Sequence, residues 1–327
     1  MAYELEEAKK LVVAAGKKLV ESGLIARTWG NVSARISDTQ FVITPSGRAY
    51  ETLTPEEVVV VNIEDCSYEG EIKPSSEKGV HAAAYRHHPT VDFVIHTHQK
   101  AATIVSITGM EIRNVYKEFQ PVLGNKVPCA DYAMSTTNSL RKKVETCIMM
   151  NPGCRAIMLM HHGTLCMGDT YEQAFEIADA LEKCCQRVIK DNYLRHSWAE
   201  TYSDEGKRNF YLKKNGAVAM PERICDLGSS VRNGKTFSLT VGGETIDVDL
   251  ETGLGITGIA PKCAKIHKAI YDSQDCSIIK HVTDPDVIAV SCTGEDMIPM
   301  IDDFAQIAGV DVKNRPWIDG DTDACAK

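Results

Sequence analysis

The chain has 327 residues, 43% of them hydrophobic and 25% charged, which is the composition of an ordinary globular protein. This length exceeds one average domain, so we expect two domains. The formal net charge of −9 argues against a general nucleic-acid binder or a protein that binds acidic membranes. A phosphorylated substrate would therefore need a local positive site, such as a metal ion or helix N-termini.

Cysteine usage and the N-terminus point to one cellular compartment. The twelve cysteines include no C-x-x-C pair, and the opening residues MAYELEEAKK are charged, unlike a signal peptide. Free thiols in a reducing environment are the better interpretation. No apolar run approaches the length of a membrane span. We therefore expect a cytoplasmic protein.

The first part of the chain predicts a helix followed by a small meander of strands. Apolar residues recur at helical spacing over residues 3–22, and strands are expected at 32–36, 41–44 and 58–63. The loops Thr28-Trp29-Gly30-Asn31 and Thr44-Pro45-Ser46-Gly47 flank the first two strands. Both combine glycine with small hydrogen-bond donors, the materials of a phosphate nest, although such loops are more often plain turns.

A possible anion site comes next, where Pro74-Ser75-Ser76-Glu77 precedes a helix expected at 78–87. Serine hydroxyls and unpaired backbone amides at a helix start favour a bound anion. The alternative is an ordinary helix cap, with serine followed by an acidic residue in the first turn.

Histidines at two strand ends suggest a metal site. In the strand expected at 91–98, His96 and His98 project from the same face because side chains alternate along a strand. They are half of a metal site, or else two polar residues on an exposed edge. A third ligand could follow the buried strand at 156–160, which runs into His161 and His162. An open site with three nitrogen ligands favours zinc, with other divalent ions possible.

The remaining elements of this half are mainly helical. Helices are expected at 101–107 and 135–150, with a loop and strand at 124–129 between them. Thr170 and Gln173 form a capping box that opens a long amphipathic helix. This helix closes the first domain, residues 1–205.

Five motifs in a fixed order carry a resemblance to a known family. They are Thr28-Trp29-Gly30-Asn31-Val32-Ser33, Thr44-Pro45-Ser46-Gly47, Pro74-Ser75-Ser76-Glu77, His96-Thr97-His98 and His161-His162-Gly163. Together they resemble the class II aldolase/adducin family over residues 1 to about 205. The chain looks most like the fuculose-phosphate aldolase branch, because Glu77 stands where the ribulose-phosphate 4-epimerase branch carries aspartate.

The resemblance implies a fold and roles for particular residues. The fold is α/β, a three-layer domain whose central, mainly antiparallel β-sheet is flanked by helices, usually in a homotetramer with sites between subunits. The implied metal ligands are His96, His98 and His162, the implied proton carrier is Glu77, and Tyr116 is the nearest match to a tyrosine that donates a proton in a neighbouring subunit's site. The implied phosphate-binding residues are Thr28, Gly30, Asn31, Thr44, Gly47, Ser75 and Ser76.

The implied activity is that of a metal-dependent aldolase. Such an enzyme reversibly cleaves a ketose 1-phosphate, of the deoxy-sugar or pentulose type, to dihydroxyacetone phosphate and an aldehyde. The alternatives are another reaction of the family (epimerase, dehydratase or decarboxylase chemistry on a sugar phosphate or sugar acid) and a non-catalytic scaffold of the adducin kind. The three histidines and Glu77 argue against the scaffold, which has no use for an open metal site. For proton transfer, Glu77 would need a raised pKa, supplied by partial burial.

The last third of the chain resembles no family. Residues 206–235 are polar and contain glycine, which suggests a linker, and residues 236–327 predict a smaller α+β domain. Its expected elements are a hairpin at 237–241 and 245–250, a helix at 261–271, strands at 277–282 and 287–291, and a helix at 297–308.

Overall fold

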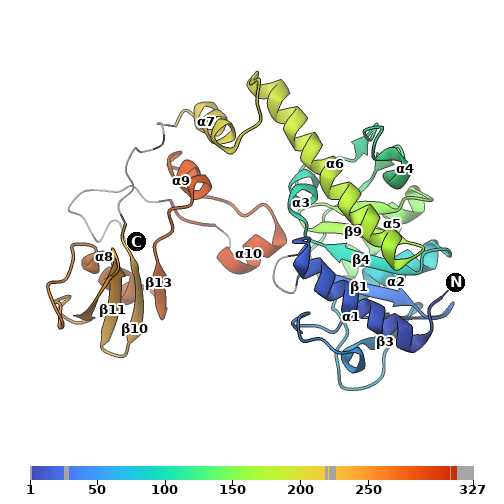
Figure 1. The fold of residues 1–327 in the computed structure, drawn as a ribbon, viewed down its shortest axis with the longest axis horizontal. Helices are drawn as coiled ribbons and strands as arrows, with labels where there is room; N and C mark the ends of the chain where they lie inside the picture. The colour runs from blue at the N-terminus through green and yellow to red at the C-terminus, as the bar shows by residue number, and fades with distance from the viewer. Residues whose placement is uncertain (1, 26–28, 218–219, 221–225, 310, 315–327) are drawn as a thin grey trace. The chain divides into compact units, whose positions relative to one another are not determined.

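The computed structural model describes residues 2–25, 29–217, 220, 226–309 and 311–314. Within it, the chain forms two compact units (Figure 1). The first comprises residues 1–196 and 299–309, and the second comprises residues 197–298 and 310–327. This division differs from the expected one at the linker, because residues 206–235 include most of helix α7 and strand β10. It also places a late segment, residues 299–309, with the first unit.

A seven-stranded sheet forms the centre of the first unit. Its strand order is β3-β2-β1-β4-β9-β8-β7, and all described pairs are antiparallel except β7 with β8. The strands are β1 (Asn31–Arg35), β2 (Gln40–Ile43), β3 (Val59–Asn62), β4 (Phe93–Thr97), β7 (Cys129–Ala130), β8 (Ala156–Leu159) and β9 (Gly163–Gly168). A small separate ladder joins β5 (Ile112–Arg113) and β6 (Lys126–Val127).

Helices cover both faces of this sheet. The core on one face includes α2 (Lys78–His87) and α5 (Asn138–Met150), and the two cores on the other include α1 (Leu5–Glu21), α3 (Lys100–Ser106) and α6 (Tyr171–Ser197). Two short elements, η1 (Pro55–Glu57) and α4 (Gln120–Leu123), complete the unit together with α10 (Asp302–Ala308) from the late segment. The three-layer α/β architecture predicted from the sequence is confirmed.

The centre of the sheet is buried on both faces because its strands are apolar on both faces. All five positions of β4 and all six of β9 are buried. Strands covered on both faces read as continuous apolar runs. Polar groups that occur inside these strands, such as His96, Thr97 and Thr164, must therefore find partners within the fold.

The second unit has a four-stranded antiparallel sheet in the order β12-β11-β10-β13. Its elements are α7 (Asp204–Lys214), β10 (Ser229–Asn233), β11 (Thr236–Val241), β12 (Glu244–Asp249), α8 (Ala264–Ser273), β13 (Ile278–Lys280) and α9 (Pro285–Ser291). Its own core gathers around Phe237, Leu239, Val248 and Tyr271.

Two predictions for the second unit were wrong. The strand expected at 287–291 is helix α9, because Asp284 caps it by accepting from the amides of Asp286 and Val287, and Pro285 stands in its first turn. The apolar run had looked like a strand because it is short. The helix expected at 297–308 begins only at Asp302, since Met297 pairs with Val312 in a β-bridge.

The second unit repeats the topology of the first half of the first unit. In both, three strands form a meander, a helix follows, and a fourth strand returns antiparallel to the first: β1-β2-β3-α2-β4 and β10-β11-β12-α8-β13. A helix then follows each fourth strand, α3 or α9. The correspondence continues beyond these helices. Met297 and Val312, which form a β-bridge, each lie 185 positions after Ile112 and Val127, which pair in the same way.

A buried polar network recurs in the two repeats. In the first, the Ser33 hydroxyl lies 2.6 Å from His81 Nδ1 and 2.7 Å from the Tyr85 hydroxyl. In the second, Ser230, His267 and Tyr271 are joined in the same way, at 2.8 and 2.9 Å. In each case the serine is on the first strand, and the other two residues are one turn apart on the helix. The second unit is therefore an incomplete internal repeat of the first.

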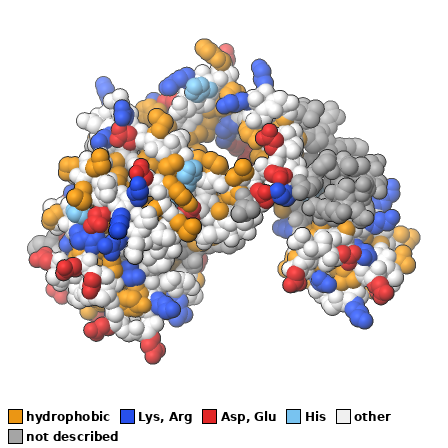
Figure 2. All heavy atoms as spheres, turned by 180° about the vertical axis from the view of Figure 1, so that it is seen from behind, with side chains coloured by type: hydrophobic (Ala, Val, Ile, Leu, Met, Phe, Trp, Pro, Cys, Tyr) orange, Lys and Arg blue, Asp and Glu red, His pale blue; other side chains and the backbone are white. Residues whose placement is uncertain are grey.

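The outer surface carries mixed charge. On the face drawn in Figure 2, basic and acidic side chains are intermingled with apolar ones. None of the helices in the described part of the chain combines the length and apolar composition that crossing a bilayer requires.

Candidate metal and substrate site

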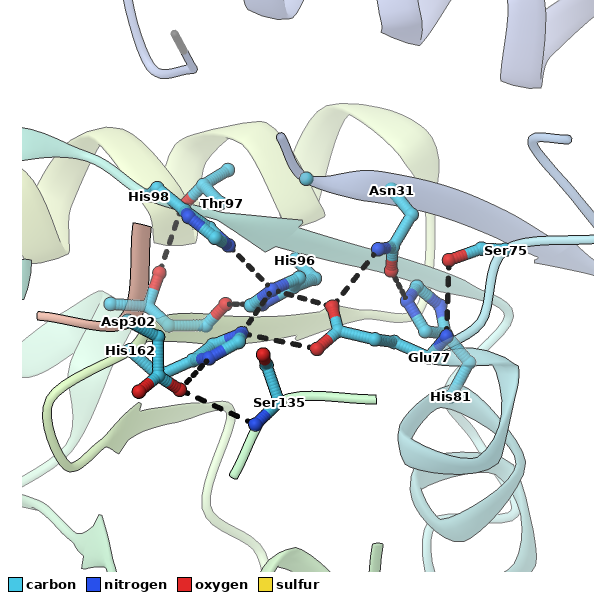
Figure 3. Close-up of polar contacts among 12 residues, drawn as sticks. Asn31, Ser75, Glu77, His81, His96, Thr97, His98, Ser135, His162 and Asp302 are labelled. Atoms are coloured by element: carbon cyan, nitrogen blue, oxygen red, sulfur yellow. Dashed lines mark hydrogen bonds and ion pairs between the residues drawn. The ribbon is translucent and has the colours of Figure 1, made fainter. Parts of the chain in front are cut away.

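Four side chains meet at one end of strands β4 and β9 (Figure 3). The candidate ligand atoms of Glu77, His96, His98 and His162 all lie within 4.8 Å of one another. Glu77 directly precedes α2, and His162 directly precedes β9. The site is thus formed by segments that are remote in sequence and adjacent in the sheet.

Close pairing of β4 with β9 brings the histidines together. His96 pairs with Leu165 and Thr97 with Thr164, so His162 lies opposite the end of β4. Gly163 permits this approach, because a Cβ atom there would meet the backbone oxygen of Thr97 at 2.4 Å. His96 and His98, two residues apart, share the face that the sequence predicted.

Backbone and carboxylate acceptors fix the orientation of two imidazoles. His96 Nδ1 lies 2.8 Å from the carbonyl oxygen of Thr164, and His162 Nδ1 lies 3.2 Å from Asp302 Oδ2. These acceptors require each Nδ1 to carry the proton, so in the neutral rings each Nε2 has a lone pair. His96 Nε2 lies 3.2 Å from His162 Nε2 and 2.9 Å from His98 Nε2. Lone pairs that face each other repel unless a cation lies among them.

The carboxylate of Glu77 completes this arrangement. Its Oε2 atom is 3.0 Å from His96 Nε2 and accepts from Asn31 Nδ2 at 3.3 Å, while its Oε1 atom is 3.1 Å from His162 Nε2. Oε1 is buried without a well-aligned hydrogen-bond donor. A buried orphan oxygen beside imidazole lone pairs fits a site that holds a divalent cation close by.

The charges of these groups are strongly coupled. Burial raises the pKa of the Glu77 carboxyl, but the adjacent His96 and His162 outweigh it and hold that pKa well below its ordinary value. The raised pKa expected for Glu77 is therefore not produced by these neighbours. Burial lowers the pKa of His162, yet hydrogen bonds to Asp302 and Glu77 raise it to about 10, so without a metal this ring holds a second proton that a bound cation would displace.

His81 supports Glu77 from behind and was missed by sequence reasoning. Its Nε2 atom lies 2.5 Å from Asn31 Oδ1, and the amide of Asn31 in turn donates to Glu77. Burial, with a smaller contribution from His96, lowers the pKa of His81 to about 3, so the ring is neutral. The helical spacing of His81, four residues after Glu77, was the available signal.

A cavity of about 200 Å³ opens beside the four side chains. Of the expected phosphate-binding residues, those that line it are Gly30, Asn31, Gly47, Ser75 and Ser76. Thr44 is not among its lining residues, because its buried hydroxyl accepts from the amide of Val32 inside the fold. Thr28 lies outside the described residues. Trp29, Pro45 and Ser46 of the two predicted loops also line it, and the lining residues that the sequence did not indicate are Ser135, Thr136 and Gln306.

Asn31 and Tyr116 make contacts within the chain that their expected roles do not include. Asn31 was expected to bind phosphate, whereas its amide links His81 to Glu77. Tyr116 was expected as a proton donor, and in this chain its hydroxyl donates to Asp191 Oδ2 at 2.8 Å while Arg187 lies over its ring. Burial and Asp191 together raise the pKa of Tyr116 to about 12.

Comparisons with known proteins find similar aldolases. A 5-deoxy-D-ribulose 1-phosphate aldolase of Bacillus thuringiensis serovar kurstaki is 33% identical over 183 residues, 56% of this chain and 84% of that protein. The L-fuculose phosphate aldolase of Escherichia coli K12 is 33% identical over 172 residues, 53% of this chain and 78% of that protein. A solved L-fuculose 1-phosphate aldolase is 28% identical with a TM-score of 0.53, covering 64% of this chain and 96% of that one.

The matched region contains the three histidines and Glu77. Residues 10–189 match the family described as Class II Aldolase and Adducin N-terminal domain. The second unit lies beyond that match. Sequence motifs, fold and site geometry thus agree, and this chain belongs to the class II aldolase and adducin family.

Proposed function

We propose that this protein is a metal-dependent aldolase that reversibly cleaves a ketose 1-phosphate to dihydroxyacetone phosphate and an aldehyde. The observation that carries the proposal is the convergence of three Nε2 atoms and the Glu77 carboxylate beside a small cavity lined by hydroxyl and backbone groups. The named activities of the two similar aldolases support a deoxy-sugar or pentulose substrate.

The proposed ligands are His96, His98 and His162, with zinc as the first choice of metal. A bound divalent cation would supply Lewis-acid stabilisation of negative charge on the substrate's oxygens. Neutral imidazoles would leave the charge of such an ion largely uncompensated. The phosphate would lie against Gly47, Ser75 and Ser76, which line the same cavity.

Glu77 is the proposed proton carrier. Cleavage takes a proton from the hydroxyl of the carbon that becomes the aldehyde, and adds one to the carbon beside the ketose carbonyl. Asn31 holds Oε2 of Glu77, whereas Oε1 has no aligned donor and is the atom available to exchange a proton. Its lowered pKa keeps it ionised and therefore able to accept.

The decisive experiment is a substrate panel with metal-quantified protein. Release of dihydroxyacetone phosphate from ketose 1-phosphates, followed by a coupled assay, should occur and be abolished by a chelator. Glu77→Gln should keep its metal but lose at least about 100-fold in kcat, whereas Glu71→Gln, at an exposed position, should match the wild type. Full activity in a metal-replete Glu77→Gln protein would refute the proton-transfer role.

The family resemblance adds a proposal about assembly. In a homotetramer, Tyr116 would donate its proton in the site of a neighbouring subunit. Sedimentation measures the oligomer, and Tyr116→Phe in the same assay should lower kcat without loss of bound metal. A fully active, monomeric Tyr116→Phe protein would exclude this role. Epimerised product from the panel, with no cleavage, would instead identify another reaction of the family.

A further inference from the structure

The late segment 299–309 makes a set of polar contacts at the histidine cluster of the first unit. The amide of Asp302 donates to the carbonyl of His161 at 3.0 Å, and His161 Nδ1 lies 2.6 Å from the carbonyl of Met300. Both contacts are made by His161, the residue that precedes His162. They place the Asp302 side chain, which is only 13% exposed, behind the His162 ring (Figure 3).

The Asp302 carboxylate is held by three groups of the first unit. Oδ2 lies 3.2 Å from His162 Nδ1 and accepts from the amide of Ser135 at 3.3 Å, and Oδ1 accepts from the Tyr132 hydroxyl at 3.2 Å. A carboxylate with several donors has a defined orientation. These donors therefore hold the Asp302 carboxylate in the orientation in which it contacts His162.

We propose that Asp302 is a positioning residue that holds His162 in the tautomer and orientation needed to bind the divalent cation. Because the carboxylate accepts from Nδ1–H, the lone pair of His162 is on Nε2, the atom that faces Glu77 and His96. A carboxylate behind a ligating imidazole also increases its basicity and the strength of ligation. The inference rests on the proposed metal site.

The hydrogen-bond acceptor at Nδ1 of His162 is a side-chain carboxylate, whereas that of His96 is a backbone carbonyl. His96 is oriented by the carbonyl of Thr164, a fixed part of the β4–β9 ladder. His162 is oriented by a charged side chain that enters from about 140 residues later in the chain. One ligand is thus set by the sheet itself, and another depends on a segment that lies outside the family match at 10–189.

The internal repeat has no counterpart of this carboxylate in its first copy. At the spacing of 185 that relates the Ile112–Val127 and Met297–Val312 pairs, Asp302 corresponds to Lys117 of the first repeat. The second repeat has Cys263 and Thr283 at the positions of Glu77 and His98, so it lacks two of the four site residues. Asp302 itself lies in the segment 299–309, which belongs to the first unit.

The test is metal affinity in full-length protein. Metal-depleted wild type and Asp302→Ala are titrated with Zn²⁺ in competition with a chromophoric chelator, and with Co²⁺ while the visible d–d bands are recorded. Asp302→Ala should bind Zn²⁺ about 10- to 100-fold more weakly, with altered Co²⁺ bands. Asp302→Asn, which keeps one acceptor oxygen, should fall between the two. Asp131→Asn removes an exposed carboxylate next to Tyr132 in the sequence and should match the wild type.

Each failure has a different meaning. Wild type without affinity for either ion would overturn the metal site and this inference with it. Wild type that binds tightly, with Asp302→Asn and Asp302→Ala indistinguishable from it in affinity and Co²⁺ spectrum, would overturn the positioning role alone. If Asp302→Ala does not fold, the isosteric Asp302→Asn decides, since unchanged affinity and bands in that variant contradict the role.

Discussion

At the scale of single residues, the site depends on hydrogen bonds made on the side away from the proposed metal. Thr164 and Asp302 accept from Nδ1 atoms, and Asn31 fixes one oxygen of Glu77. Sequence motifs identify the converging residues because strand alternation pairs His96 with His98 and the family resemblance adds His162 and Glu77. They do not identify the groups behind them, since Asp302 and His81 belong to no motif and are brought in only by folding.

His81 gives a prediction about pH. Its pKa of about 3 in the folded protein lies below its ordinary value, so the unfolded chain takes up the proton first as pH falls. The stability contributed by the neutral ring is fully present above the unfolded pKa and is lost as pH falls toward 3. Between pH 7 and pH 5 the free energy of unfolding should drop by roughly 2 kcal/mol from this residue.

Urea denaturation at the two pH values measures this drop. His81→Gln keeps a hydrogen-bonding side chain but does not titrate, so its decrease between pH 7 and pH 5 should be smaller by that amount. Other titrating groups are common to both proteins and cancel in the comparison. An equal decrease in wild type and variant would contradict the assignment of a buried, neutral His81.

At the scale of elements, alternation and helical spacing predicted most of the first unit correctly. Helices at the start, at 78–87 and after Thr170, and strands before the histidine motifs, occur close to the expected positions. Errors occurred where a short apolar run had no length to distinguish strand from helix, as at 287–291, which is α9. Thr44 shows a different limit, because a motif residue can be used for packing inside the fold.

The contact between β4 and β9 gives a prediction at this scale. In Gly163→Ala the new methyl group would meet the Thr97 oxygen at 2.4 Å and the His98 ring at 3.0 Å. The backbone cannot yield without moving His162. We expect the free energy of unfolding to fall by at least about 2 kcal/mol and metal affinity to fall with it.

Chemical denaturation and metal titration of the same protein check both effects. Gly258→Ala is a suitable control, because its added methyl group would make only ordinary contacts near Ile246. If Gly163→Ala has wild-type stability and metal affinity, the strands are not as closely apposed at the site as described.

At the scale of the whole molecule, the two units have separate cores, and among the described residues the histidine cluster lies in the first unit. A ligand that binds one folded unit stabilises that unit by mass action. Removal of metal should therefore speed amide hydrogen exchange in β4, β9 and the segment 302–308, and leave β10–β12 unchanged. Mass spectrometry with and without chelator measures this. An equal change in β10–β12 would contradict the independence of the units.

The repeat itself escaped prediction from the sequence. The identities that link the two copies are scattered, and they include Ser33 with Ser230, His81 with His267, and Tyr85 with Tyr271. The signal becomes visible when strand registers are compared, because Ser33 pairs with Val94 as Ser230 pairs with Ile279. Sequence alone thus predicted the second unit as α+β without its relation to the first.

The Ser–His–Tyr network of the second repeat shows that this network can serve the fold without serving a reaction. Ser230, His267 and Tyr271 stay joined in a unit that carries Cys263 and Thr283 in place of two site residues. A network that persists where no reaction is assigned serves to lock a strand onto its helix. Loss of turnover in a His81 variant would therefore report a loosened scaffold under Glu77, and His267 offers the same substitution in a setting where only folding is at stake.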